Sequence, residues 1–234
     1  MSGPAPGNVP VDAEDGSDET EQVGEAIAAF VMEEAPAHME FEFEATDEAA
    51  RLRVHVHESV AGLAVGGTGG WVWNSSVFLA RWLYATASRR AALRDKTVLE
   101  LGCGSSAIPS LMAAKLGASA VVASDLCEDC NQAAKENIRS ENLSASIAVA
   151  SLDIICPEEE SLRGLGAPAD VILFADLVYL EKLAAALPDT IALLLRRAPD
   201  PSAASCFGCI AERTLFGGTL CCPSTRPCPS TLPP

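Results

Sequence analysis

Hydrophobic and charged residues alternate with period two near the beginning of the chain. Residues 41–46 and 52–57 both show this alternation on either side of a short polar break, which predicts a β-hairpin. Its apolar face carries Leu52 and neighbouring valines, and His55 and His57 lie on the other face. We interpret these histidines as solvated strand residues, because no third metal ligand accompanies them.

The pattern then changes to continuous apolar runs that alternate with amphipathic stretches. Apolar runs of this length are typical of parallel strands buried on both faces. Strands are expected at residues 98–101, 119–124, 146–150, 171–175 and 205–212. Helices are expected at residues 107–117, 128–141 and 181–197, and a further helix at residues 23–31. Strands alternating with helices predict an α/β fold with a parallel sheet.

Individual residues add three local predictions. Asn74 is expected to be the N-cap of a helix that carries Phe78, Leu79, Trp82 and Leu83 on one face. Residues 66–70 hold four glycines and predict a flexible turn. Pro188 lies within the last helix, and we expect it to kink or split that helix.

A glycine turn follows the first parallel strand. Gly102 and Gly104 precede Ala107, and the helix that begins there would leave bare backbone N–H groups for a ligand. This spacing fits the dinucleotide fingerprint and other nucleoside-binding turns, and also an ordinary strand–turn–helix joint. Two acids favour a ligand. Glu100 ends the strand, and Asp125 ends the next strand, 21 residues after Gly104, where an acid is placed to bind ribose hydroxyls.

These motifs, taken in order, resemble the seven-strand S-adenosylmethionine-dependent methyltransferases, and more narrowly methyltransferase-like family 16. The resemblance rests on residues 100–104, on Asp125, on the Asp176-x-x-Tyr179 motif after the fourth strand and on a tryptophan-bearing segment around Trp73. It covers residues 50–215. It implies a Rossmann-like seven-strand sheet, with the hairpin and a helix at its N-terminal side, and S-adenosylmethionine as the cofactor.

The resemblance also implies roles for individual residues. Glu100 would lie near the cofactor's amino group, Asp125 would bind the ribose and Asp153 the adenine, although Ile154 stands where related enzymes often have tryptophan. Asp176 and Tyr179 would be catalytic and face the acceptor amine. The implied cofactor-binding residues are Trp73, Glu100, Gly102, Cys103, Gly104, Asp125, Asp153 and Ala175. The implied reaction is methylation of a protein side chain, with lysine as the expected acceptor.

The chain divides into three parts by composition. Residues 1–37 are expected to be an acidic, largely disordered leader, residues 38–215 the methyltransferase domain, and residues 216–234 an irregular, disordered tail. The tail is rich in Gly, Pro, Thr and Cys and shows no periodicity. We therefore expect the last helix and strand of the fold to be missing or altered.

Charge and cysteine content limit the partners and the compartment. The net charge is −16, but residues 1–50 hold fourteen acids and no Lys or Arg, so the rest of the chain is close to neutral. No basic stripe indicates nucleic-acid binding, and no apolar run indicates a membrane span or signal peptide. Nine cysteines at irregular spacings are interpreted as reduced thiols. We expect a monomeric, cytoplasmic protein that acts on a protein substrate, with the nucleus as the second candidate compartment.

Three alternatives stay open from the sequence. Cys127-x-x-Cys130 and Cys206-x-x-Cys209 are spaced like two halves of a zinc site, but three residues apart on a strand places the second pair on opposite faces, so no metal is expected. The glycine turn is also compatible with a nicotinamide-dependent oxidoreductase. The irregular tail is compatible with a non-catalytic or truncated binding module of the methyltransferase fold.

Overall fold

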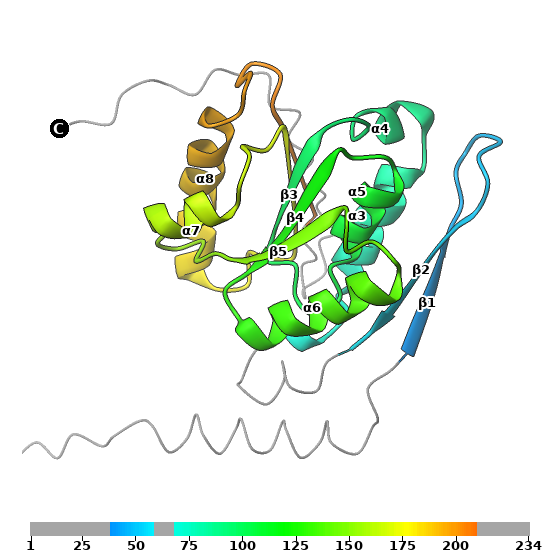
Figure 1. The fold of residues 1–234 in the computed structure, drawn as a ribbon, viewed down its shortest axis with the longest axis horizontal. Helices are drawn as coiled ribbons and strands as arrows, with labels where there is room; N and C mark the ends of the chain where they lie inside the picture. Colours follow the sequence, from blue (N-terminus) through cyan, green and yellow to red (C-terminus); the bar gives the residue numbers. More distant parts are fainter. Residues whose placement is uncertain (1–37, 59–67, 210–234) are drawn as a thin grey trace, which may run out of the picture.

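A parallel sheet of five strands forms the centre of the protein. The computed structural model describes residues 38–58 and 68–209, and Figure 1 shows the sheet between helices. The strands are β3 (Thr97–Leu101), β4 (Ala120–Asp125), β5 (Ile147–Ser151), β6 (Val171–Ala175) and β7 (Ser205–Cys209). Their order is β5-β4-β3-β6-β7. Counted from β3, this is the order 3-2-1-4-5 of a Rossmann-like sheet, as predicted.

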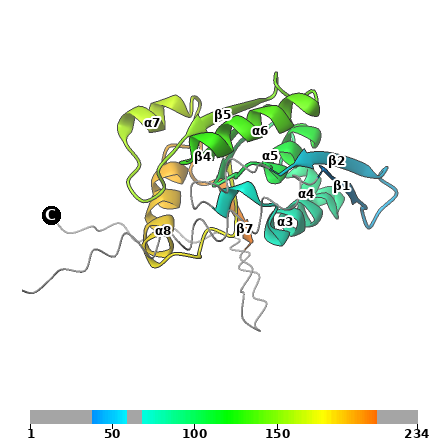
Figure 2. The ribbon, with the colours of Figure 1, turned by 90° about the horizontal axis from the view of Figure 1, so that it is seen from below.

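Helices cover both faces of this sheet (Figure 2). One face packs against α3 (Asn74–Tyr84), α5 (Ile108–Lys115) and α6 (Glu128–Ser140). The other packs against α7 (Glu159–Gly164) and α8 (Glu181–Arg196). Alternate strand residues serve the two cores: Val98 belongs to the first and Leu99 to the second. The continuous apolar runs of the sequence are thus explained by burial on both faces.

The N-terminal hairpin is confirmed. Strand β1 (His38–Phe43) pairs antiparallel with β2 (Leu52–His57), and Phe43 of β1 and Val54 and Val56 of β2 are fully buried. The backbone N–H of His57 donates to Asn137 Oδ1 at 2.8 Å, and Asn137 Nδ2 returns a bond to the His57 carbonyl at 3.0 Å. These bonds fix the hairpin to α6, outside the main sheet.

Three local predictions need correction. Asn74 is the first helical residue of α3 and not its N-cap; Trp73 holds that position in an extended conformation, and no side chain caps the helix. Of residues 66–70 the structure describes 68–70, and Thr68–Gly70 forms a short 3-10 helix, η1, where a flexible turn was expected. Helix α8 runs unbroken from Glu181 to Arg196, so Pro188 does not split it; the kink stays a prediction.

Several predictions concern residues that the structure does not describe. The helix expected at residues 23–31, the leader, the tail and the last three residues of the strand expected at 205–212 all fall there. Within residues 38–58 and 68–209, no helix has both the length and the apolar character that a bilayer crossing requires. The short helix α4 (Ala87–Ala91) completes the described elements.

Candidate functional site

A cavity of about 860 Å³ opens where the carboxyl ends of β3, β4 and β6 meet. Ligand sites of parallel α/β sheets lie at this edge, and this volume is that of a cofactor-sized site. Nine of the ten residues predicted from the sequence line it. They are Trp73, Glu100, Gly102, Cys103, Gly104, Asp125, Ala175, Asp176 and Tyr179.

The turn after β3 brings bare backbone to the cavity. Gly102 and Gly104 have φ angles of +62° and +58°, which favour glycine. A Cβ atom on Gly102 would lie 2.2 Å from Leu177 Cδ2, and one on Gly104 would lie 2.8 Å from the carbonyl oxygen of Gly69. The Ser105 N–H donates to that same carbonyl at 2.7 Å. A side chain at Gly104 would therefore meet fixed backbone, whereas at Gly102 the positive φ and the need to move Leu177 both favour glycine.

Glu100 is a buried acid at the floor of the cavity, 1% exposed. Its Oε2 accepts bonds from the Ser110 backbone N–H at 2.8 Å and from Ser110 Oγ at 2.5 Å. Burial raises the pKa of Glu100 to about 7, although the two Ser110 bonds act in the opposite direction. A cation bound above this carboxyl would favour its ionised form.

Asp125 connects the tips of two strands. Its Oδ2 accepts from the Gly104 N–H at 3.0 Å and its Oδ1 accepts from the Cys127 N–H at 2.9 Å. Burial nevertheless raises the pKa of this carboxyl above its ordinary value. The two backbone donors hold the side chain in place beside the glycine turn, where the sequence predicted a ribose-binding acid.

Asp176 and Tyr179 lie beyond the end of β6. Asp176 has a φ of +56°, an uncommon conformation for a residue other than glycine, and its N–H donates to the Cys209 carbonyl at 2.8 Å. The neighbouring β7 therefore holds this strained residue at the cavity. Tyr179 is 55% exposed, and Trp71 on the same cavity is 40% exposed. Aromatic rings thus flank the opening.

Asp153 does not line the cavity. Its Oδ1 accepts from the N–H groups of Ile155 at 2.8 Å and Cys156 at 3.3 Å, so the carboxylate stabilises the bend that follows β5. Its role in binding adenine stays a prediction.

The charged side chains that line the cavity, among the described residues, are all acidic. Among the described residues that line it, five carry carboxyl groups and none is Lys or Arg. These acids are Glu100, Asp125, Glu128, Asp129 and Asp176. Such a lining favours cationic ligands over phosphates or nucleic acid.

Some lining residues were missed from the sequence. Gly69 and Trp71 reach the cavity through the packing of η1 against the glycine turn, a contact between segments more than thirty residues apart. Nothing in the sequence indicates that contact. Cys127 and Cys130 could have been found, because they follow Asp125 directly, at the N-cap and in the first turn of α6.

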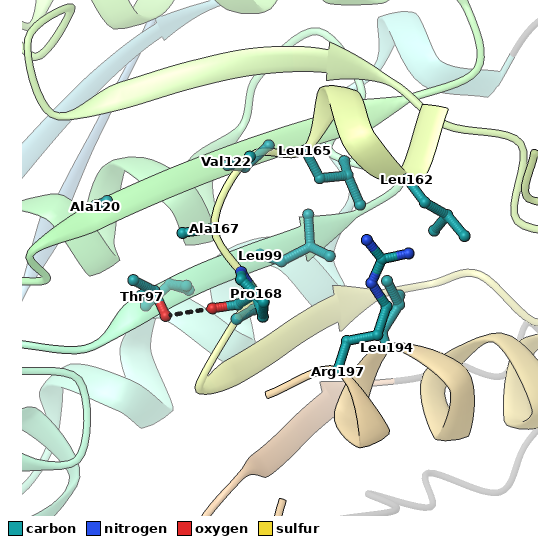
Figure 3. A pocket seen from close by; sticks show the side chains of 13 residues that line it. Thr97, Leu99, Ala120, Val122, Leu162, Leu165, Ala167, Pro168, Leu194 and Arg197 are labelled. Atoms are coloured by element: carbon teal, nitrogen blue, oxygen red, sulfur yellow. Dashed lines mark hydrogen bonds between the residues drawn. The ribbon is translucent and has the colours of Figure 1, made fainter. Parts of the chain in front are cut away.

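A second cavity, of about 60 Å³, lies at the opposite edge of the sheet (Figure 3). Thr97, at the start of β3, borders it and donates its hydroxyl to the Pro168 carbonyl at 2.9 Å. Residues 165–169, Leu162 of α7 and Leu194 of α8 supply part of the rest of its lining. Its lining is mostly apolar, apart from Thr97 and Arg197, and the cavity is too small for a nucleoside.

The sheet separates the two CxxC pairs. Cys127 follows β4, whereas Cys206 and Cys209 lie on β7, with β3 and β6 between. Cys206 packs in the core beneath α8 and Cys209 in the core beneath α3, so their side chains point to opposite faces as predicted. Within the described part of the chain, no three His, Cys, Asp or Glu side chains are grouped as a metal site requires.

Comparison with known proteins decides the family. The model of the lysine methyltransferase family matches residues 53–213, more than half of the chain. The chain belongs to this family. S-adenosylmethionine is its cofactor, and the nicotinamide-dependent alternative is wrong.

Two curated relatives match about half of the chain or less. A protein-lysine N-methyltransferase EFM3 of Chaetomium thermophilum is 33% identical over 122 residues, which cover 50% of this chain and 35% of that protein. A ribosomal protein L11 methyltransferase of Thermosipho melanesiensis is 34% identical over 96 residues, 41% of this chain and 37% of that protein. The chain thus spans little more than a third of these relatives.

Among solved structures, the ribosomal protein L11 methylase of Lactobacillus delbrueckii subsp. bulgaricus matches with a TM-score of 0.40 and 26% identity, covering 55% of this chain and 56% of that chain. A PRMT1 enzyme–prozyme complex of Trypanosoma brucei with AdoHcy matches with a TM-score of 0.38 and 23% identity, covering 50% of this chain and 36% of that chain.

Proposed function

We propose that this protein transfers a methyl group from S-adenosylmethionine to a lysine side chain of a protein substrate. The observation that carries the proposal is the convergence of three strand ends, at Glu100–Gly104, Asp125 and Asp176–Tyr179, on one cavity. The family match and the 33% identity to a protein-lysine methyltransferase support the acceptor. The monomeric state and the cytoplasmic location stay predictions from the sequence.

The residues at the β3 and β4 tips fit the cofactor. Bare backbone at Gly102 and Gly104 allows close approach, and Asp125 is held where it accepts hydrogen bonds from ribose hydroxyls. Glu100, buried beneath the turn, offers a carboxylate to the ammonium group. The cofactor supplies a methyl group on a positively charged sulfur, and a lining whose charged residues are all acids suits that charge.

The residues after β6 fit the acceptor. A lysine ammonium must lose a proton before its nitrogen can attack, and Asp176 offers a carboxylate that orients the amine or accepts that proton. Tyr179 and Trp71 offer aromatic faces to the alkyl-ammonium chain. In this assignment, the site further promotes transfer by positioning the acceptor nitrogen against the methyl group and by excluding water.

Cofactor binding is the first test. Isothermal titration of the full chain with S-adenosylhomocysteine is expected to show one saturable site, and Gly104→Ala is expected to abolish it, because the added Cβ meets the Gly69 carbonyl. The absence of binding to the unaltered chain, shown to be folded by circular dichroism, would refute the proposal and favour the non-catalytic alternative.

The acceptor role is tested with Asp176→Asn, which keeps a side chain that tolerates the positive φ. We expect this variant to bind S-adenosylhomocysteine with unchanged affinity and to lose transfer of label from the cofactor to proteins of a cell extract. Asp189→Asn, on the exposed face of α8, is the matched control and should transfer label normally. Label recovered on a residue other than lysine after hydrolysis would correct the acceptor, and full transfer by Asp176→Asn would remove Asp176 from the reaction.

A further inference from the structure

Two thiols lie against one another in the wall of the cofactor cavity. Cys127 is the N-cap of α6 and Cys130 follows it in the first turn. Both line the cavity, and a side-chain hydrogen bond joins them. Side chains three residues apart at a helix start are neighbours, so small rotations would bring the two sulfur atoms to the bond length of a disulfide, about 2.05 Å.

The two thiols differ in access. Cys127 is partly exposed, whereas Cys130 is fully buried. Cys130 Sγ packs so closely against η1 that a Cβ on Gly69 would lie 2.6 Å from it. An oxidant from solvent therefore meets Cys127 first, and Cys130 is already in place behind it.

The pair is connected to the cofactor site through the backbone. The N–H of Cys127 donates to Asp125 Oδ1 at 2.9 Å, and Asp125 Oδ2 accepts from the Gly104 N–H at 3.0 Å. Closing the disulfide requires the backbone at Cys127 to adjust wherever side-chain rotation alone is not enough, and such an adjustment displaces a donor that holds the Asp125 carboxylate. The thiol pair and the ribose-binding acid are thus parts of one arrangement.

We propose that Cys127 and Cys130 form a reversible disulfide under peroxide and that this disulfide weakens cofactor binding. The Cys127 thiolate attacks the peroxide O–O bond, giving a sulfenic acid and releasing water or an alcohol. The Cys130 sulfur then attacks that sulfur, and its proton leaves with the sulfenic oxygen as water. Two thiols lose two hydrogens in total, and the peroxide is reduced. A dithiol reverses the reaction.

This inference rests on the proposed cofactor site, and linkage makes it reciprocal. If the disulfide lowers the affinity for the cofactor by some factor, bound cofactor must disfavour the disulfide by the same factor. Because Cys127 lines the cavity, a cofactor bound there would also shield its thiol from solvent. A chain saturated with cofactor is therefore protected, and the chain without cofactor is the form that oxidises.

The test uses the full chain and S-adenosylhomocysteine. After treatment with hydrogen peroxide, peptide mass spectrometry is expected to show a Cys127–Cys130 cross-link that dithiothreitol removes. Isothermal titration should show an affinity about ten-fold weaker for the oxidised chain than for the reduced one, within the usual range of coupling between two linked events. In a redox buffer of reduced and oxidised dithiothreitol, saturating S-adenosylhomocysteine should shift the thiol–disulfide equilibrium toward the two free thiols by a similar factor.

Two variants make the test specific. Cys127→Ser keeps the backbone donor to Asp125 but cannot form the disulfide, so peroxide should leave its affinity unchanged. Cys156→Ser removes an exposed thiol outside the cavity and should respond to peroxide as the unaltered chain does. Failure of the reduced chain to bind S-adenosylhomocysteine would refute the proposed function. A reduced chain that binds normally, and that either forms no cross-link or binds equally well after cross-linking, would refute the thiol pair alone.

Discussion

Replacing Glu100 by glutamine should make the chain without cofactor more stable at high pH. Glu100 is 1% exposed, and burial raises its pKa to about 7 from the ordinary value of 4.5. The folded state therefore binds a proton that the unfolded chain has released over this range of pH. Glutamine has nearly the same shape, can still accept from Ser110, and carries no charge to bury.

The sign and size follow from that pKa. Because the pKa of Glu100 is higher in the folded state, its contribution is fully present below pH 4.5 and is lost as the pH rises through about 7. Because the pKa of Glu100 differs by about 2.5 between the unfolded and the folded chain, the free energy at stake is at most about 3 kcal/mol. Glu100→Gln should therefore gain up to about 3 kcal/mol over the unaltered chain at about pH 8, and much less at about pH 5.

Urea denaturation at the two pH values measures this difference. Glu136→Gln, at an exposed acid on α6, is the matched control and should leave the free energy of unfolding within about 0.5 kcal/mol of the unaltered chain. In the proposed site Glu100 pairs with the ammonium group of the cofactor, so the same Glu100→Gln variant should bind S-adenosylhomocysteine about ten-fold more weakly or worse. Saturating S-adenosylhomocysteine should also flatten the pH dependence of the unaltered chain. Identical pH profiles for Glu100→Gln and the unaltered chain would refute the reasoning.

Three further substitutions test the surroundings of the site. Gly102→Ala should cost about 1–3 kcal/mol of stability and abolish cofactor binding, because φ is positive and the new Cβ would lie 2.2 Å from Leu177 Cδ2. Gly166→Ala has a positive φ but open space around it, so it measures the backbone cost alone, and equal urea midpoints for the two variants would contradict this prediction. Ser110→Ala removes the 2.5 Å hydrogen bond from Ser110 Oγ, which lowers the pKa of Glu100, so the loss of stability with rising pH should extend to higher pH. In the same urea series, a pH midpoint of that loss that is unmoved or lower would contradict this prediction. Glu141→Ala removes the hydrogen bond from the His55 N–H of β2 and the ion pair with Lys115 of α5, so amide hydrogen exchange in β2 should accelerate. Unchanged protection of β2 would show that Glu141 does not hold this strand. Its hydrogen bonds outweigh burial and lower the pKa of Glu141, so its contribution to stability should be lost as the pH falls below about 4.5.

Strong periodicity in the sequence predicted most of the described elements. The hairpin and the five strands appear within a few residues of the expected positions, because alternation and continuous apolar runs report burial directly. Helices α4 and α7 were not predicted. Helix α4 buries no residue and α7 buries only Leu162, so neither leaves a hydrophobic pattern in the sequence. Trp73 replaced Asn74 at the cap because packing, and not a capping side chain, sets the start of α3.

The site was predictable where topology alone decides position. Acids that follow parallel strands meet at one edge, which is why Glu100, Asp125 and Asp176 come together. Asp153 follows a strand by the same rule, yet its carboxylate is bonded to the loop after β5. Which way a side chain turns after a strand depends on nearby N–H groups, and the sequence pattern does not report them. The contact of Gly69 with the glycine turn was missed for a similar reason, since it depends on how two distant loops pack.

Buried ionisable groups gather at one edge of this sheet and indicate the charge of its ligand. Four described side chains have a pKa raised chiefly by burial, and all four line the same cavity: Glu100, Cys103, Asp125 and Cys130. At the opposite edge Asp170 accepts the Thr97 N–H at 2.9 Å and completes the start of β3. Burying acids without a counter-charge costs stability, and a cationic ligand offsets that cost. A cationic cofactor should therefore stabilise this fold more than neutral adenosine does, even where both fill the cavity.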